Sequence, residues 1–308
     1  MLFCFSRASI ASYVIGLVLV GAFVPSAIAR EHAGRVVYDV DIAGLGDGAA
    51  RDLFKETSTL LRRRDDPPAA FAILQQWIQK DIRTLQKILR ARGYYAGRVS
   101  YQVDRRVDPV RIEFLVDTGP QYKIKSAELV LHGHEVGDAV RTDLHAYLPV
   151  AGEPATATRI LVAEKDILAR LPNVGFPLAK RRDRQVVIRH ADRTAHLHYE
   201  IDPGPLVRFG AVEFRGAKDV EVRYLERLLP WREGDIYDDR LMADLRENLA
   251  ATSLFSAVTA SLGKPDADGR APVLVTLEEA PHRSYGGGAG YSSGDGFGAS
   301  VFWEHRNF

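Results

Sequence analysis

The sequence has almost no cysteine, since Cys4 is the single one and lies in an apolar segment near the N-terminus. One cysteine cannot form an intramolecular disulfide, so the folded part is expected to take its stability from hydrophobic cores. An excess of charge of one sign is also missing, because 41 Lys and Arg face 40 Asp and Glu. A dedicated nucleic-acid binder carries a basic face or tail, so nucleic acid is not expected as a partner.

Long uncharged runs are absent except at the N-terminus. Arg7 precedes an uncharged run over 10–24, and an A-x-A site then follows directly before Arg30. A basic start, an apolar centre and a small-residue site in this order predict a secretory signal peptide over 1–29, cleaved between Ala29 and Arg30. An N-terminal membrane anchor is the alternative, but a spanning helix needs about 20 apolar residues. Export without cysteine is typical of a bacterial envelope protein.

The rest of the chain repeats one pattern three times. Each copy ends in a run that alternates apolar and mostly polar residues, which is typical of a half-buried strand. These runs are 110–117, 195–202 and 273–278. Gly-Pro or Ala-Pro follows each run, and after the first two a new strand opens the next copy. The repeat therefore predicts domains at 35–120, 121–205 and 206–281.

Two helices are expected between the opening and closing strands of each copy. In the first copy, an amphipathic helix is predicted by apolar residues at helical spacing, namely Leu74, Ile78, Ile82, Leu85 and Leu89. A middle strand follows the second helix of each copy. The middle strands are expected at 98–103, 185–190 and 257–262. The order β-α-α-β-β predicts an α+β fold in which two helices cover one face of a three-stranded sheet.

The third copy carries the residues that link the repeat to a known family. Gly234-Asp235-Ile236-Tyr237 precedes leucines at helical spacing, and Leu254-Phe255 then precedes Val258. Three β-α-α-β-β copies with these motifs resemble the POTRA domains of outer-membrane assembly factors. Three copies are most similar to the TamA-like subfamily, because BamA-like members carry five and two-partner secretion transporters carry two. The resemblance implies a protein of the bacterial outer membrane with its POTRA domains in the periplasm, without enzymatic activity or cofactors.

Residues 283–308 alternate aromatic and small residues around a Gly-Asp-Gly turn. By the same resemblance they are the first hairpin of a transmembrane β-barrel, with one face formed by Tyr285, Ala289, Tyr291, Phe297, Ala299, Val301 and Trp303. A barrel must close to satisfy its backbone, and two strands cannot close one. We therefore expect a truncated sequence. A protein that works without its own barrel is the alternative.

Three short patterns could carry chemistry, but structural explanations fit them better. Residues 290–294 match G-x-S-x-G, yet that motif needs a following helix, whereas a turn and a second strand are expected here. His196 and His198 share one strand face, but no third metal ligand is evident from the spacing. The basic triplet 180–182 is expected in an exposed loop. The sequence thus predicts no catalytic residue, no bound metal and no cofactor.

Without covalent chemistry, function is expected to lie in surfaces. If the closing strand is central in each sheet, the middle strand lies at an edge, where unpaired N–H and C=O groups can accept an extended peptide. The predicted peptide-binding residues are Val99, Tyr101, Val103, Val187, Ile188, Val258 and Ala260.

The partners are expectations from the resemblance. They are unfolded outer-membrane or autotransporter clients, an inner-membrane-anchored TamB-like protein, and the outer membrane itself through the missing barrel. Two alternatives remain at this point: a two-partner-secretion-type transporter for one secreted partner, and a barrel-less periplasmic scaffold.

Overall fold

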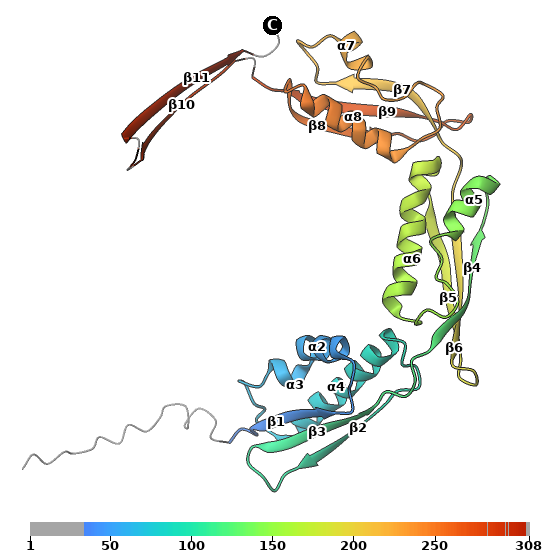
Figure 1. Ribbon diagram of the computed structural model, residues 1–308, viewed down its shortest axis with the longest axis vertical. Coiled ribbons are helices and arrows are strands. Elements are labelled where there is room, and N and C mark those ends of the chain that lie inside the picture. Colours follow the sequence, from blue (N-terminus) through green and yellow to red (C-terminus); the bar gives the residue numbers. More distant parts are fainter. Residues whose placement is uncertain (1–33, 282, 293, 295, 306–308) are drawn as a thin grey trace, which may run out of the picture.

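A computed structural model describes residues 34–281, 283–292, 294 and 296–305. Figure 1 shows three α+β units along a curved chain, followed by a two-stranded hairpin. The expected signal peptide and its cleavage site lie outside the described residues. Within the described part of the chain, no helix is long and apolar enough to cross a membrane.

The strands of the three units form three sheets with the same order. In each unit the opening strand pairs in parallel with the closing strand, and the middle strand pairs antiparallel with its other side. The first sheet is β1 (Tyr38–Ala43), β3 (Val110–Asp117) and β2 (Arg98–Asp104). The second is β4 (Lys123–Leu131), β6 (Thr194–Asp202) and β5 (Lys180–Arg189). The third is β7 (Arg208–Arg215), β9 (Arg270–Glu279) and β8 (Phe255–Leu262). The predicted edge position of the middle strand is confirmed in all three units.

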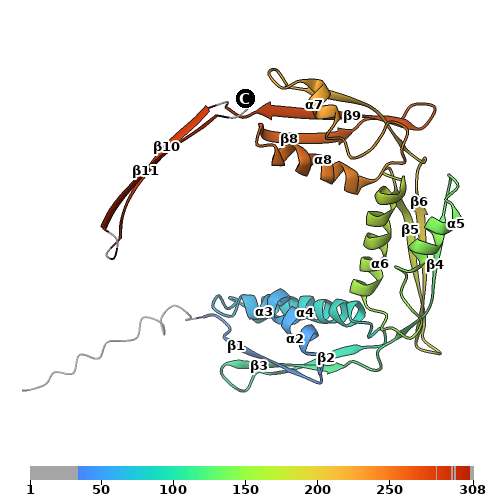
Figure 2. The same cartoon turned by 45° about the horizontal axis from the view of Figure 1, so that its top comes forward.

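Helices cover one face of each sheet. The first unit has α2 (Gly48–Thr57), α3 (Thr59–Arg62) and α4 (Phe71–Ala91). The second has α5 (Asp138–His145), α6 (Ala157–Arg170) and the 3-10 helix η1 (Leu171–Val174). The third has α7 (Val222–Glu226) and α8 (Asp239–Ala251). Figures 1 and 2 show α4, α6 and α8 on the concave side of the curved chain and the sheets on its convex side.

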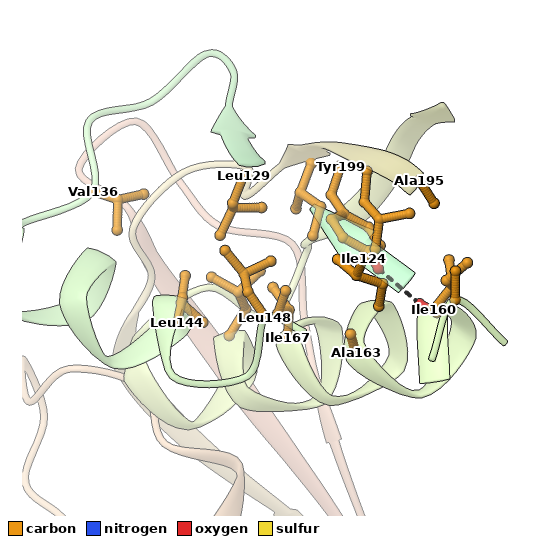
Figure 3. Packing of buried hydrophobic residues seen from close by; sticks show 14 of the residues in the cluster. Ile124, Leu129, Val136, Leu144, Leu148, Ile160, Ala163, Ile167, Ala195 and Tyr199 are labelled. Carbon is orange, nitrogen blue, oxygen red and sulfur yellow. Dashed lines mark hydrogen bonds between the residues drawn. The ribbon is translucent and has the colours of Figure 1, made fainter. Parts of the chain in front are cut away.

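Each unit encloses its own apolar core between helices and sheet. Figure 3 shows the second core, where Leu144 of α5 and Leu148 of the turn after it meet Ile160, Ala163 and Ile167 of α6. The period-2 pattern of β6 explains which of its residues enter this core: those on one face are buried, while those on the other remain half-exposed. Tyr199 of β6 is fully buried, and its hydroxyl donates to the Ile160 carbonyl at 3.1 Å.

This tyrosine predicts a loss of stability at high pH. Burial raises the pKa of Tyr199 to about 12, from the ordinary value of 10.0. Because the folded state favours the neutral phenol, the contribution of Tyr199 is complete below pH 10 and is lost as the pH rises towards 12. We expect Tyr199→Phe to lose about 1 kcal/mol near neutral pH, through the missing hydrogen bond, and to show a flatter decline above pH 10. Urea unfolding across this pH range measures both effects, and an equally steep decline in both proteins would contradict the assignment.

The first unit contains a fully buried carboxylate, Asp81 of α4. It accepts hydrogen bonds from the Ser58 hydroxyl at 2.5 Å and from the backbone N–H groups of Thr59 at 2.7 Å and Leu60 at 3.0 Å. The first N–H groups of a helix have no partner within the helix. Asp81 therefore joins α4 to the start of α3 by satisfying groups that would otherwise be buried without partners.

The hairpin consists of β10 (Arg283–Ser292) and β11 (Gly296–His305), paired antiparallel. Tyr285 lies opposite Trp303, and Tyr291 lies opposite Phe297. Directly opposite residues share a face, so the register confirms that the predicted aromatic and small residues form one face. Ser292 ends β10, and the next element is β11 rather than a helix. The G-x-S-x-G pattern thus lacks the strand-turn-helix context of a nucleophile elbow.

Candidate functional site

The candidate site is the set of outer strands β2, β5 and β8. Each of them pairs on one side only, with the closing strand of its unit. Within the described residues, their backbone groups make no hydrogen bond to a segment on the other side. A row of unpaired N–H and C=O groups is a template for another strand. Each unit therefore offers a free sheet edge at its middle strand, which spans 98–104, 180–189 or 255–262. In the first sheet β1 is an outer strand as well.

The opposite edges of the second and third sheets are partly covered. The Ile124 N–H donates to the Glu153 carbonyl at 2.8 Å, and the Phe209 N–H donates to the Asp235 carbonyl at 2.9 Å. These bonds place the segments before α6 and α8 against the starts of β4 and β7. In these two units, β5 and β8 are therefore the edges that remain open along their length.

The structure places most predicted peptide-binding side chains on the helix side of their strands. Val99, Tyr101 and Val103 are half-buried against the first core, and Val258 and Ala260 pack likewise against the third. A strand added at these edges would bond to their backbone groups, and these half-buried side chains would neighbour only the residues on its helix side.

The two predicted residues of β5 differ from each other. Ile188 packs against the second core, whereas Val187 lies on the outer face of the sheet and is 52% exposed. The register explains this, because Val187 lies opposite the half-exposed His196, while Ile188 lies opposite the fully buried Ala195.

Sequence reasoning missed a groove of about 410 Å³ at the junction of the first and second units. One wall comes from β5 and α6, and includes Val186, Ile188 and Leu161. The first unit supplies Arg90, Ala91 and Tyr95, and the remaining lining residues are Ala157, Ile160 and Arg184. In the sequence, the groove is indicated only by apolar residues such as Leu161 and Val186, which remain exposed on α6 and β5. Their pattern does not show that the end of α4 lies beside them.

Hydrogen bonds between consecutive units fix this junction. The Tyr122 N–H donates to the Gly93 carbonyl at 2.9 Å, and the Tyr95 hydroxyl donates to the Ala155 carbonyl at 2.9 Å. At the next junction the Val207 N–H donates to the Gly175 carbonyl at 2.8 Å. At both junctions, the residue just before the opening strand of a unit is thus bonded to the turn that follows the helices of the preceding unit.

The predicted basic loop at 180–182 is wrong, because these residues begin β5. They are exposed, as expected, but they extend the middle strand of the second unit towards its N-terminus. A β-bulge between Arg181 and Asp183 accommodates Arg182. Three consecutive basic residues are compatible with an edge strand because charged side chains there remain in water.

The histidine pair lies on the outer face of the second sheet. The Glu128 carboxylate lies 3.3 Å from His198 Nδ1, and the Ser126 hydroxyl lies 2.8 Å from His196 Nδ1. Among the described residues, no group of three or more His, Cys, Asp or Glu side chains has an arrangement that could hold a metal ion.

Residues 207–280 match the POTRA family, described as a surface antigen variable number repeat. Three solved structures illustrate the likeness. POTRA domains 3–5 of BamA from Haemophilus influenzae are 16% identical, with a TM-score of 0.44 over 80% of this chain and 96% of that one. BamA from Haemophilus ducreyi lacking POTRA domains 1–3 is 20% identical, with a TM-score of 0.48 over 58% of this chain and 34% of that one. CdiB from Escherichia coli is 15% identical, with a TM-score of 0.29 over 73% of this chain and 38% of that one.

The fold is α+β, with three tandem units of the same strand order followed by a two-stranded hairpin. The third unit matches the family in sequence, and the first two repeat its strand order and its helix-covered face.

Proposed function

We propose that the chain is the polypeptide-binding POTRA array of an outer-membrane protein assembly or translocation factor. One observation carries this proposal: the same strand order occurs three times and leaves β2, β5 and β8 as free edges. A free edge binds an extended segment through main-chain hydrogen bonds, and side-chain pockets add specificity. Main-chain bonding tolerates many sequences, which suits a factor that handles unfolded clients.

The proposal includes finer assignments. The units 35–120, 121–205 and 206–281 act as separate domains in the periplasm. The clients are unfolded outer-membrane or autotransporter proteins. A TamA-like factor would use its first unit to contact an inner-membrane-anchored TamB-like protein and its third unit to couple clients to an outer-membrane barrel. Three units within the described residues and the aromatic face of β10 and β11 support this subfamily.

Site-specific photo-crosslinking tests the proposal. A photoreactive amino acid is placed at Gln102, Val187 or Thr259, which are exposed outer-face positions of the three free edges. The full chain is then mixed with an unfolded outer-membrane protein diluted from urea. We expect crosslinked client at one or more of these positions, because an added strand lies directly beside them.

Matched controls lie on the opposite strand of each sheet and on the same face. These exposed positions are Asp41, Glu128 and Glu213. Crosslinking that is equal at both sets of positions would show that binding is not confined to β2, β5 and β8, because β1, β4 and β7 are outer strands too. Crosslinking that is absent from both sets would contradict edge binding. In cells, capture of a single dedicated secreted protein would instead favour the two-partner-secretion-type transporter. Capture of an inner-membrane protein at Gln102 would support the TamB-like partner.

A further inference from the structure

We propose that the junction groove, lined by β5, α6 and the end of α4, binds an extended polypeptide segment that is rich in acidic residues. This inference rests on the proposed function, since it requires β5 to accept a strand, and it names the class of segment that β5 selects. The other two edges would not share this selectivity. Three observations support it: the composition of β5, a basic stripe on α4, and the apolar lining between them.

Charge separates β5 from the other free edges. Its ten residues, Lys180–Arg189, include five basic residues and a single acid, Asp183. The eight residues of β8 carry no charge, and β2 carries one residue of each sign. An added strand lies about 4.8 Å from its neighbour, so its side chains would lie beside those of β5. Alternating acidic residues in that strand would form favourable cross-strand pairs, whereas basic residues would be repelled.

The bulge in β5 leaves two arginines on the helix side of the sheet, and one of them, Arg184, lines the groove. It places Arg181 opposite Ile201 and Arg184 opposite Tyr199, both of which face the helices. The two arginines share one partner, Glu164 of α6, at 3.7 and 2.8 Å. One carboxylate therefore faces two guanidinium groups, which leaves this side of β5 with net positive charge.

A basic stripe on α4 leads to the same groove. We define the basic stripe as Lys80, Arg83, Lys87 and Arg90, whose spacing of three, four and three residues places them on one side of the helix. All four are exposed, and within the described residues they have no ion pair. The acid of α4, Asp81, is buried and bonded to the start of α3. Arg90 ends the stripe and lines the groove.

The basic stripe opposes the stability of its own helix. Like charges at i,i+3 and i,i+4 destabilise a helix because their side chains are neighbours on its surface. Lys80 and Arg83, Arg83 and Lys87, and Lys87 and Arg90 are such pairs. A ligand with negative charges would offset the repulsion among these four side chains. The basic stripe is therefore complementary in charge to an acidic segment.

The geometry favours a polypeptide over a membrane surface. The groove has apolar lining from Leu161, Val186 and Ile188, and it runs beside a strand with free backbone groups. Figures 1 and 2 show α4 and α6 on the concave side of the curved chain, where a flat bilayer would be held away by the flanking units. An extended segment with apolar and acidic residues in alternation matches both the lining and the charge.

Fluorescently labelled peptides test the selectivity on the full chain. Three peptides of equal length alternate valine with glutamate, serine or lysine. We expect the glutamate peptide to bind most tightly and the lysine peptide most weakly, with the difference reduced by added salt. The variant Lys87→Gln/Arg90→Gln is expected to weaken binding of the glutamate peptide about tenfold and to leave the serine peptide unchanged. The matched control is Arg223→Gln/Lys264→Gln, which removes two exposed charges from the third unit and is expected to have no effect.

Crosslinking locates the bound peptide. Leu161 lines the groove and is 48% exposed, whereas the adjacent Val162 is 41% exposed and lies outside the lining. A photoreactive residue at 161, but not at 162, is expected to capture the glutamate peptide.

The possible outcomes separate this inference from the proposed function. If all three peptides bind equally and crosslink at Val187, edge binding stands and acidic selectivity is overturned. If none crosslinks at any free edge, both proposals fail. If the α4 variant loses binding to vesicles of anionic phospholipid but keeps its affinity for the glutamate peptide, the basic stripe contacts membranes and the inference is overturned.

Discussion

Replacing Asp81 by alanine is expected to destabilise the first unit by about 3–5 kcal/mol, because it leaves three buried donors without an acceptor. The donors are the hydroxyl of Ser58 and the N–H groups of Thr59 and Leu60. The site is fully buried, so water cannot reach these groups without local opening. A loss of this size is a large fraction of the stability of a small domain.

Hydrogen exchange read by mass spectrometry measures this effect unit by unit. Protection is expected to fall in the peptides of α3 and α4 in Asp81→Ala and to persist in the second and third units. The matched control is Asp52→Ala, which removes an exposed carboxylate that lies 3.2 Å from Lys55. Exposed pairs contribute about 1 kcal/mol or less, so the control should resemble the wild type. Unchanged protection of α4 in Asp81→Ala would show that this carboxylate is not a structural acceptor.

A second large effect is expected at Gly216, which follows β7 with φ +91°. A Cβ atom there would lie 2.0 Å from the Leu277 carbonyl oxygen, which is a backbone atom of the central strand. Gly234 has the same φ of +91°, but no atom lies within 4 Å of the Cβ position. Gly234→Ala therefore reports the backbone strain alone, about 1–2 kcal/mol. Gly216→Ala adds a steric clash that only displacement of β7 or β9 can relieve, and we expect it to lose about 3 kcal/mol or more.

Urea unfolding of the two variants gives this comparison directly. Trp231 belongs to the third core, stacked on Phe209 at a centroid distance of 4.1 Å, so its fluorescence follows this unit. Gly44 provides an independent check in the first unit, because its Cβ would lie 2.0 Å from the Val116 carbonyl oxygen. Equal losses in Gly216→Ala and Gly234→Ala would mean that the sheet accommodates the added methyl group.

Much of the fold could be predicted from local patterns. Alternation in 110–117, 195–202 and 273–278 identified the three closing strands, and helical spacing from Leu74 to Leu89 identified the centre of α4. These predictions succeed because burial on one face of a strand or helix imposes a period on neighbouring residues. The strand order then made the middle strands edges, as the structure confirms.

Other features depend on residues far apart in sequence. Asp81 occupies a position that the pattern of α4 alone leaves unassigned, and it is buried only because the start of α3 packs against it. The loop predicted at 180–182 is a strand, because pairing with Asp202 and Ile201 extends β5 beyond its apolar part. The spacing of apolar residues within β5 does not indicate this pairing with β6, because the two strands are separate segments of the sequence.

The sequence by itself determined the three repeats, their β-α-α-β-β order and the edge position of β2, β5 and β8, because each is encoded within a single unit. Only the tertiary structure shows that β5 is the edge strand with both a groove beside it and an excess of positive charge. That combination depends on the hydrogen bonds that place Tyr95 and Arg90 beside α6, and on the bulge that turns Arg181 and Arg184 to one side. Both arise from contacts between segments tens of residues apart, where sequence periodicity carries no information.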